Sequence, residues 1–459
     1  MSNSLSQYYR CRDEDVPLFL AGPPSGEKGY FKFRENVFYG RLSDGTTRTS
    51  LNHSIEDVSA RCSVREGGVA LPFDPEEVTT LLRLEAYVHL PGAVHPASSL
   101  VGRSYYFLRP ALPVAVRRHL QKFRLNGWRH LRFPNWPVDR TVDCLHEQLL
   151  LLSLRASHRR EIPFIWFWPN GASSCAILTH DVETAAGRDF CSSLMDVDYQ
   201  FGLKASFQVV PESRYEVPEG YLETIRNRGF EVAVQDLNHD GHLFRERKEF
   251  LARVRKINEY GRKYGAEGFR AAVLYRRQDW YDALEFSYDM SVPNVAHLDP
   301  QRGGCCTVMP YFIGKLVELP VTATQDYSLF YILRDHSIDL WKQQIDLIMD
   351  KHGLMNFIIH PDYIICQEEM ATYKNLLSYL AQLTAKKNIW MPLPREVASW
   401  WRDRANMRLV EVNGRWQIEG KGSERARIAY ASEKDGQLSY SFQSLTESTE
   451  VGMLRSQPN

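Results

Sequence analysis

The sequence predicts an α/β fold built around a barrel of β/α units, and three observations support this prediction. Eight short apolar runs recur between residues 175 and 391. Several of these runs are separated by stretches whose apolar residues repeat with helical spacing, over about 225 residues in all, which indicates parallel strands joined by helices. A set of about eight such strands is typical of a closed β/α barrel.

Residues 1–160 precede the barrel and mix turns, short strands and a few helices, so we expect an N-terminal α+β region that packs on it. Asp74 and Pro75 are typical of the N-cap and first turn of a helix. Val78, Leu81 and Leu82 follow with helical spacing. The sequence therefore predicts a helix that begins at residue 75.

Residues 161–405 contain the predicted barrel. Its strands are expected at CAIL (175–178), ASFQVV (205–210), FEVAV (230–234), GFRAAVL (268–274), YDMSV (288–292), LVELPV (316–321), MNFII (355–359) and IWM (389–391). Three apolar stripes at helical spacing lie between them, at 250–257, 340–348 and 370–380. Gly353 follows the second stripe and is a typical helix stop.

The C-terminal part predicts a small β appendage over 406–445. One hairpin is expected around Asn413 and Gly414, and a second around Asp435 and Gly436, because Asn-Gly and Asp-Gly favour tight turns. Residues 446–459 are polar, and we expect a disordered tail there.

Composition excludes several classes of function. The 459 residues contain 56 Lys and Arg against 56 Asp and Glu, so no net charge favours nucleic acid as a partner. No apolar run is long enough for a membrane span, and the charged N-terminus lacks a secretory signal. The eight cysteines show no CxxC spacing and indicate reduced thiols of a cytoplasmic protein. The sequence predicts no particular oligomeric state.

Polar side chains that can do chemistry follow four of the predicted strands. They lie at 179–183, 235–242, Arg270 and 360–362. The reactive groups of β/α barrels lie where strands end at the C-terminal mouth, so we expect these residues to gather there. Asp181 and Glu183 are two residues apart and face the same side of an extended chain, so one can bind a cation while the other handles a proton.

These segments resemble the motifs of the polysaccharide deacetylases of carbohydrate esterase family 4, the NodB-like domain. The family's T-F-D-D motif, or its D-x-D variant, matches T-H-D-V-E at 179–183, and H-[ST]-x-x-H matches Q-D-L-N-H at 235–239. The arginine motif matches Phe269 and Arg270, followed by Tyr275 and Trp280, and the final histidine motif matches 357–360. The resemblance covers roughly 173–400, has the form of a bacterial branch, and implies a distorted (β/α) barrel.

The resemblance implies a metal-dependent enzyme that hydrolyses N-acetyl groups of amino-sugar glycans. Asp181 would be the catalytic base and His360 the acid, while Glu183 and His239 would bind a divalent metal, zinc by resemblance. Arg270 would orient Asp181. Arg270, Tyr275 and Trp280 would contribute to substrate binding. The expected partner is an N-acetylated glycan or a lipid-linked sugar.

Two positions depart from the family pattern. Glu183 stands where the family has aspartate, which keeps a carboxylate, and Gln235 stands where the family has a metal-binding histidine. A carboxamide oxygen is a harder and weaker donor than imidazole, so Gln235 would be a weak ligand that favours Mn²⁺ or Mg²⁺ over Zn²⁺. From an extended strand end Asp236 would face away, and Asp240 and His242 would reach the site only after the loop rearranges.

Three hypotheses about function follow from the sequence. The first is an active carbohydrate N-deacetylase with an altered metal site. The second is a catalytically impaired pseudo-deacetylase that binds sugar or acts as a regulatory protein, since one of three metal ligands is replaced. The third is a different hydrolase or lyase on the same barrel, because a fold does not fix a function.

Overall fold

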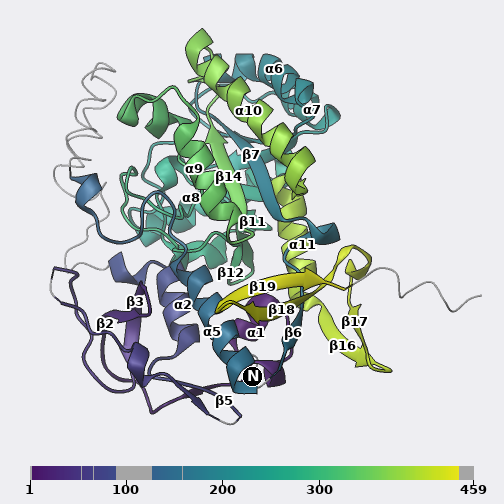
Figure 1. Cartoon of the computed structure of the whole chain (residues 1–459). Helices are drawn as coiled ribbons and strands as arrows, with labels where there is room; N and C mark the ends of the chain where they lie inside the picture. The colour runs from purple at the N-terminus through teal and green to yellow at the C-terminus, as the bar shows by residue number, and fades with distance from the viewer. Residues whose placement is uncertain (1–2, 53, 66, 89–126, 158, 444–459) are drawn as a thin grey trace, which may run out of the picture.

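The computed structural model describes residues 3–443 apart from 53, 66, 89–126 and 158. The predicted tail, 446–459, lies outside the described residues. The central feature of the structure is a curled sheet of nine strands surrounded by helices. A second group of helices and small sheets lies below this sheet (Figure 1).

The central sheet has the strand order β12-β13-β11-β10-β9-β8-β7-β14, and β15 pairs with β7. Its parallel strands are β7 (Ser174–Val182), β8 (Ala205–Val209), β9 (Glu231–Gln235), β10 (Gly268–Arg270), β11 (Tyr288–Asp289), β13 (Leu316–Glu318), β14 (Leu354–Ile359) and β15 (Ile389–Trp390). Each of the eight predicted runs is therefore a strand of one parallel sheet. β12 (Tyr311–Ile313) is antiparallel to β13 and was not expected from the sequence.

Segment 319–323, which follows β13, closes the curled sheet by bonding to β14. The backbone N–H of Ala323 donates to the carbonyl of Asn356 at 3.2 Å. Thr322 Oγ1 donates to the carbonyl of Leu354 at 2.7 Å, and Asn356 Nδ2 donates to the carbonyl of Leu319 at 3.0 Å. No strand ladder joins these two segments among the described residues. The predicted fold class, a distorted barrel, is thereby confirmed.

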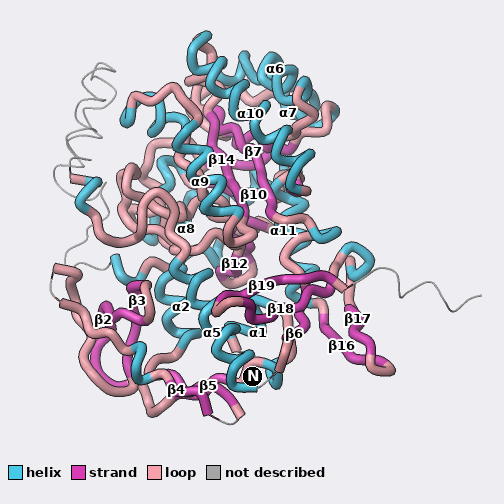
Figure 2. The backbone as a smooth tube through the Cα atoms, viewed as in Figure 1, coloured by secondary structure: helices cyan, strands magenta, loops and turns pink. Residues whose placement is uncertain are grey.

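Five helices cover the outer face of the sheet: α6 (Ala185–Gln200), α7 (Glu219–Asn227), α8 (Arg247–Tyr264), α9 (Asp339–Met349) and α10 (Gln367–Lys387) (Figure 2). Their apolar stripes and the outward side chains of the strands form one hydrophobic core. The three predicted stripes lie on α8, α9 and α10. The sheet is thus held from outside by the helices, which leaves its interior for polar side chains.

The N-terminal region contains α1 (Ser4–Tyr9), β1 (Leu18–Leu20), β2 (Ser25–Phe33), β3 (Asn36–Leu42), β4 (Ser63–Arg65), β5 (Gly68–Leu71), α2 (Pro75–Arg83) and α5 (Thr141–Ser157). Asp74 caps α2 as expected, and its side chain accepts from the N–H of Glu76 at 2.9 Å. A second hydrophobic core joins this region to side chains at the lower end of the barrel, among them Ile177 and Leu354.

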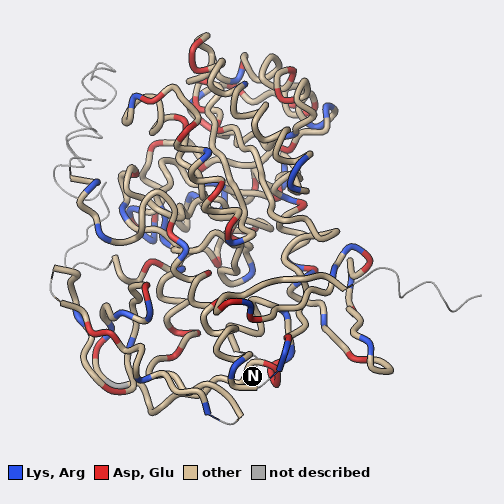
Figure 3. Tube along the Cα trace, in the orientation of Figure 1, with Lys and Arg blue, Asp and Glu red and all other residues tan. Residues whose placement is uncertain are grey.

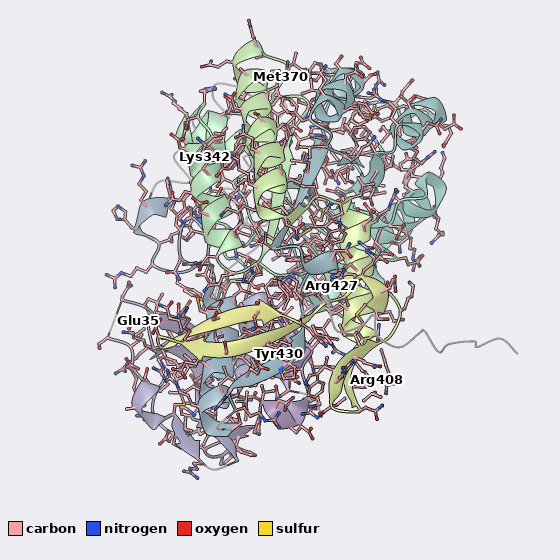
Figure 4. All side chains as sticks on the ribbon, turned by 45° about the vertical axis from the view of Figure 1, so that its right-hand side comes forward. Glu35, Lys342, Met370, Arg408, Arg427 and Tyr430 are labelled. Atoms are coloured by element: carbon pink, nitrogen blue, oxygen red, sulfur yellow. The ribbon has the colours of Figure 1, made fainter. Side chains whose placement is uncertain are left out.

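The C-terminal part follows α11 (Pro394–Asn406) and forms the two predicted hairpins. They are β16 (Arg408–Val412) with β17 (Arg415–Glu419), and β18 (Ile428–Lys434) with β19 (Gln437–Phe442). β18 also pairs with β6 (Glu161–Ile165), so the second hairpin completes a three-stranded sheet with a strand that precedes the barrel. Figure 4 shows this hairpin, marked by Tyr430, below α9 and α10. The domain boundaries expected from the sequence stay a prediction.

Charges of both signs are interspersed over the chain (Figure 3), in agreement with the balanced composition. None of the described helices is both long and apolar enough to cross a membrane.

Candidate active site

Asp181 lies near the end of β7 and points into the barrel. Its neighbour Leu178 packs among the residues that face the helices, and alternation along the strand places Asp181 on the other face. Arg270 Nη1 donates to Asp181 Oδ1 at 2.5 Å, and Gln235 Nε2 donates to Asp181 Oδ2 at 3.0 Å. Arg270 also donates to Thr179 Oγ1 at 2.8 Å. The carboxylate is therefore held at both oxygens by the ends of two neighbouring strands.

His360 follows β14 directly and is held by Asp326. Its Nδ1 lies 2.6 Å from Asp326 Oδ1, and its backbone N–H donates to Asp326 Oδ2 at 2.7 Å. The other ring nitrogen, Nε2, lies 3.6 Å from Glu183 Oε1. The Asp326 carboxylate thus accepts from the backbone N–H of His360 and pairs with its Nδ1, which leaves Nε2 to face Glu183.

Glu183 and His239 form a close pair at the centre of this site. Oε1 of Glu183 lies 2.8 Å from Nε2 of His239. The imidazole is buried, and this carboxylate is the close polar partner of its Nε2. The backbone N–H of Glu183 donates to Asp362 Oδ2 at 3.0 Å, which fixes the chain just beyond β7.

Gln235 ends β9, next to Arg270 in the strand register. The hydrogen bond from its Nε2 to Asp181 fixes the orientation of the carboxamide. The carboxamide oxygen, Oε1, is buried and has no hydrogen-bond partner. Buried polar atoms are nearly always paired, so this unpaired acceptor is unusual.

The other polar side chains of this loop have contacts of their own, although Asp236 Oδ2 is also buried without a hydrogen-bond partner. Asp236 Oδ1 accepts from the backbone N–H of Leu237 at 2.7 Å, in a residue with φ of 54°. Asp240 accepts from Arg253 of α8 at 2.7 and 2.8 Å. His242 lies 3.7 Å from Asp240. Asp240 and His242 therefore do not take the place of the imidazole that Gln235 replaces.

The charges of the site shift three pKa values. Burial alone would raise the pKa of Glu183, but His239, His360 and Arg214 outweigh it and hold the pKa well below its usual range. Burial would lower the pKa of His239, yet Glu183 raises it. Burial would also lower the pKa of His360, but Asp326, Glu183 and Asp181 raise it to about 10. These carboxylates favour the protonated imidazole, the form that a general acid needs before it acts.

The residues present fit a divalent metal only if Gln235 contributes. Within the described part of the chain, no three His, Cys, Asp or Glu side chains form a group that could hold a metal ion. Two ligand atoms bound to one ion lie about 3 Å apart, a separation that the 2.8 Å pair of Glu183 and His239 matches. Gln235 Oε1 is buried without a hydrogen-bond partner and would be the third donor.

The residues predicted to bind substrate have other surroundings. Arg270 is fully buried against Asp181, so it positions the carboxylate. Tyr275 and Trp280 are 1% and 7% exposed and belong to the core under the helices. Trp280 packs against Phe250 with ring centroids 5.4 Å apart. The aromatic residues after β10 thus contribute packing, and their part in substrate binding stays a prediction.

The structure adds three tyrosines that the sequence analysis missed. Tyr331 lies in a π-helix, Ser328–Leu333, and Tyr327 directly precedes this helix. Tyr363 follows β14. Their ring centroids are 5.3 to 5.5 Å apart, all three are partly exposed, and Tyr363 lies 4.8 Å from the ring of His360. Single-turn π segments are frequent at functional sites. We call Tyr327, Tyr331 and Tyr363 the tyrosine cluster.

Comparisons with known proteins found similar solved structures, but no match to the sequence. The chain matches no protein-family model, and no curated protein matches it in sequence. The structure is similar to one from Mycobacterium smegmatis described as a polysaccharide deacetylase, with a TM-score of 0.43 and 18% identity over 52% of this chain and 93% of that chain.

Two further solved structures each match about half of the chain. Puue allantoinase has a TM-score of 0.41 and 10% identity, over 51% of this chain and 92% of that chain. The peptidoglycan deacetylase PdaC from Bacillus subtilis has a TM-score of 0.32 and 14% identity, over 51% of this chain and 95% of that chain. These similarities concern the fold of the barrel, so a function has to be argued from the site.

Proposed function

We propose that this protein is a metal-dependent N-deacetylase that acts on an amino-sugar glycan or a lipid-linked glycan precursor. One observation carries the proposal: Asp181, held by Arg270, and Glu183 both interact electrostatically with His360, which Asp326 holds. A carboxylate base and a protonated imidazole in one buried site are the two groups that amide hydrolysis needs for proton transfer.

Each residue of the site has a separate role in the proposed reaction. Asp181 accepts a proton from the attacking water, and Arg270 with Gln235 holds its two oxygens in place. His360 Nε2 donates a proton to the nitrogen of the departing amine, while Asp326 fixes the ring. A divalent metal held by Glu183, His239 and Gln235 would supply Lewis-acid polarisation of the acetyl carbonyl.

The tyrosine cluster supports a sugar as the substrate. Its rings are partly exposed beside His360, where the leaving sugar would lie. Aromatic side chains bind ligands through their large apolar faces, and a sugar ring has an apolar face of C–H groups between its hydroxyls. Tyr363 Oη also lies 3.5 Å from Glu183 Oε2, which connects this surface to the centre of the site.

Acetate release tests the proposal. The full chain, supplied with Mn²⁺, is incubated with an N-acetylated chitooligosaccharide, and acetate is measured enzymatically. We expect Asp181→Asn and His360→Asn each to reduce kcat by at least about 100-fold, since general acid–base catalysis contributes about 10²–10⁴-fold. Asp196→Asn is the control, because Asp196 lies on the surface in an ion pair with Arg228.

A second function, sugar binding without catalysis, is favoured by Gln235 alone. A site with one carboxamide in place of imidazole binds metal more weakly and supplies less Lewis acidity. In that case the wild-type chain binds the oligosaccharide in calorimetry but releases no acetate with Mn²⁺, Mg²⁺ or Zn²⁺. Acetate release that Asp181→Asn abolishes would exclude this alternative.

A further inference from the structure

A small pocket lies between the N-terminal region and the loops that follow the barrel strands. The N-terminal region contributes Trp136 and Pro137, while the barrel contributes residues that follow β10, β11 and β13, among them Leu274, Asp299 and Gln325. The pocket is partly open to solvent and has room for a substituent of a sugar, but not for a whole sugar ring. The proposed reaction gives this pocket no role.

Two segments of the barrel connect the pocket to the catalytic site. Val321 lines the pocket and packs with Ile358, a residue of β14 that lies two positions before His360. Gln325 also lines the pocket, and the next residue, Asp326, pairs with the ring of His360 at 2.6 Å. The pocket and the catalytic imidazole are therefore built on the same two segments.

Trp136 is held at the pocket by contacts with the barrel. The carbonyl of the next residue accepts from Gln344 Nε2 of α9 at 3.1 Å. The N–H of Asp139 donates to Asn294 Oδ1 at 2.8 Å, and Asn294 Nδ2 donates to the carbonyl of Asp139 at 2.7 Å. The indole stacks on His297 with ring centroids 5.8 Å apart and is partly exposed. A side chain fixed in this way loses little conformational freedom when it binds a ligand.

Asp299 and Gln325 add polar groups to the same pocket. Asp299 is 7% exposed, and its Oδ1 accepts from Gln325 Nε2 at 2.9 Å. Sites for small molecules combine an apolar or aromatic lining with a few placed polar groups. A sugar has apolar C–H faces and polar hydroxyls, so an indole face beside a carboxylate and a carboxamide suits a sugar.

We propose that this pocket is part of a second sugar subsite, which the N-terminal region and the barrel form together. One sugar lies beside His360 for deacetylation, and the neighbouring sugar lies on Trp136 with one of its substituents in the pocket. The inference rests on the proposed deacetylase function. It adds to that function a preference for substrates of at least two linked sugars, which the barrel alone does not supply.

Calorimetric titration with N-acetylated chitotriose and with N-acetylglucosamine tests the proposal. Every protein compared is the full chain with Asp181→Asn, supplied with Mn²⁺, so that binding is measured without turnover. We expect chitotriose to bind at least about tenfold more tightly than N-acetylglucosamine, because it reaches both subsites. Trp136→Ala should weaken chitotriose binding about fivefold, as loss of an aromatic contact does, and leave the binding of N-acetylglucosamine unchanged.

Trp416→Ala is the matched control, because Trp416 is also a partly exposed tryptophan but lies on β17, outside the barrel. It should leave both affinities unchanged. Trp136→Phe keeps an aromatic face and should retain most of the affinity for chitotriose. Asp299→Asn keeps an acceptor for Gln325 and should weaken chitotriose binding about threefold. The last two variants test the subsite even where urea denaturation shows that Trp136→Ala is unstable.

The proposal is overturned if chitotriose binds no more tightly than N-acetylglucosamine. It is also overturned if Trp136→Ala weakens the binding of both ligands equally, or of neither. Binding of chitotriose that depends on Trp136, together with no acetate release by the wild-type chain, would refute the deacetylase function and leave a sugar-binding pocket. Acetate release with the same kcat/KM from N-acetylglucosamine and from chitotriose would refute the subsite alone, so the two proposals fail separately.

Discussion

Two buried polar clusters lie on opposite faces of strand β7, and they differ in whether their hydrogen bonds are complete. On the helix-covered face, His180 Nε2 lies 2.9 Å from Asp198 Oδ2, and Tyr373 donates to Asp198 Oδ1 at 2.6 Å. The other ring nitrogen of His180 lies 3.3 Å from the carbonyl of Ile359. Every polar atom of this outer cluster has a partner within the protein.

On the inner face the neighbouring residue, Asp181, is also fully paired, but the residues beside it are not. Gln235 Oε1 and both ring nitrogens of His239 are buried without hydrogen-bond partners. Unpaired buried polar groups cost free energy and persist where a ligand completes them. The comparison teaches that the outer cluster stabilises the barrel wall, whereas the inner cluster is preorganised for binding.

The largest effect is expected where the outer cluster is broken. Asp198→Ala leaves the His180 ring and the Tyr373 hydroxyl buried without an acceptor, so the free energy of unfolding should fall by about 3 kcal/mol. Urea denaturation followed by fluorescence measures it. Asp196→Ala on the same helix removes only a surface ion pair and should cost less than about 0.5 kcal/mol. Equal losses in both variants would show that the outer cluster is not a stabilising element.

The inner cluster should behave in the opposite way. His239→Leu removes an imidazole whose one close polar partner is Glu183, whereas the ring of His180 has two, so the free energy of unfolding without metal should fall less than in His180→Leu. Its Mn²⁺ affinity should fall by about 100-fold or more. His180→Leu is the matched control and should cost about 2 to 3 kcal/mol while leaving metal affinity unchanged. A strongly destabilised His239→Leu would mean that the inner cluster is structural as well.

The barrel could be predicted because apolar runs and helical stripes alternate in the sequence, and each of the eight runs became a parallel strand. The polar strand ends could also be placed, since parallel strands share one mouth. Asp181, Glu183, His239 and His360 gather there as expected. Their catalytic and metal-binding roles stay predictions.

The partners of these residues could not be predicted in the same way. Asp326 lies in a loop eight residues beyond β13 and belongs to no motif, and it reaches His360 only because 319–323 bonds to β14. The hydrogen bond between Gln235 and Asp181 depends on the strand register, which the sequence does not fix. Tyr275 and Trp280, which follow β10, are buried in the helix-covered core, a packing that the arginine motif does not indicate, and their part in substrate binding stays a prediction.

Glu231, the first residue of β9, is buried and hydrogen-bonded, yet its ionisation should lower the free energy of unfolding. Burial raises the pKa of Glu231 to about 7, although Tyr288 donates to it at 2.6 Å. A carboxyl whose pKa is raised on folding stabilises the protein fully below its unfolded pKa of about 4.3, and this stability is lost as pH rises through about 7.

The free energy of unfolding should therefore fall by about 2 kcal/mol more between pH 5 and pH 8 in wild type than in Glu231→Gln. Urea denaturation at both pH values measures the difference. Glu223→Gln, an exposed position on α7, should keep the wild-type slope. Parallel slopes in all three proteins would show that Glu231 ionises without cost.

The smallest effect is expected at the rim of the inner site. Tyr331→Ala removes one partly exposed ring of the tyrosine cluster without touching Asp181 or His360, and an aromatic contact of this kind contributes about 1 kcal/mol. On the proposed deacetylase function, KM for the chitooligosaccharide should rise about fivefold with kcat unchanged. Tyr260→Ala on α8 is the control, because Tyr260 is also a partly exposed tyrosine but lies outside the tyrosine cluster, with its hydroxyl 3.2 Å from Glu212. A fall in kcat at constant KM would show instead that the tyrosine cluster holds His360 in place, because Tyr363 contacts both Tyr331 and His360. The tyrosine cluster would then act together with the inner cluster, and would not be a separate sugar-binding surface.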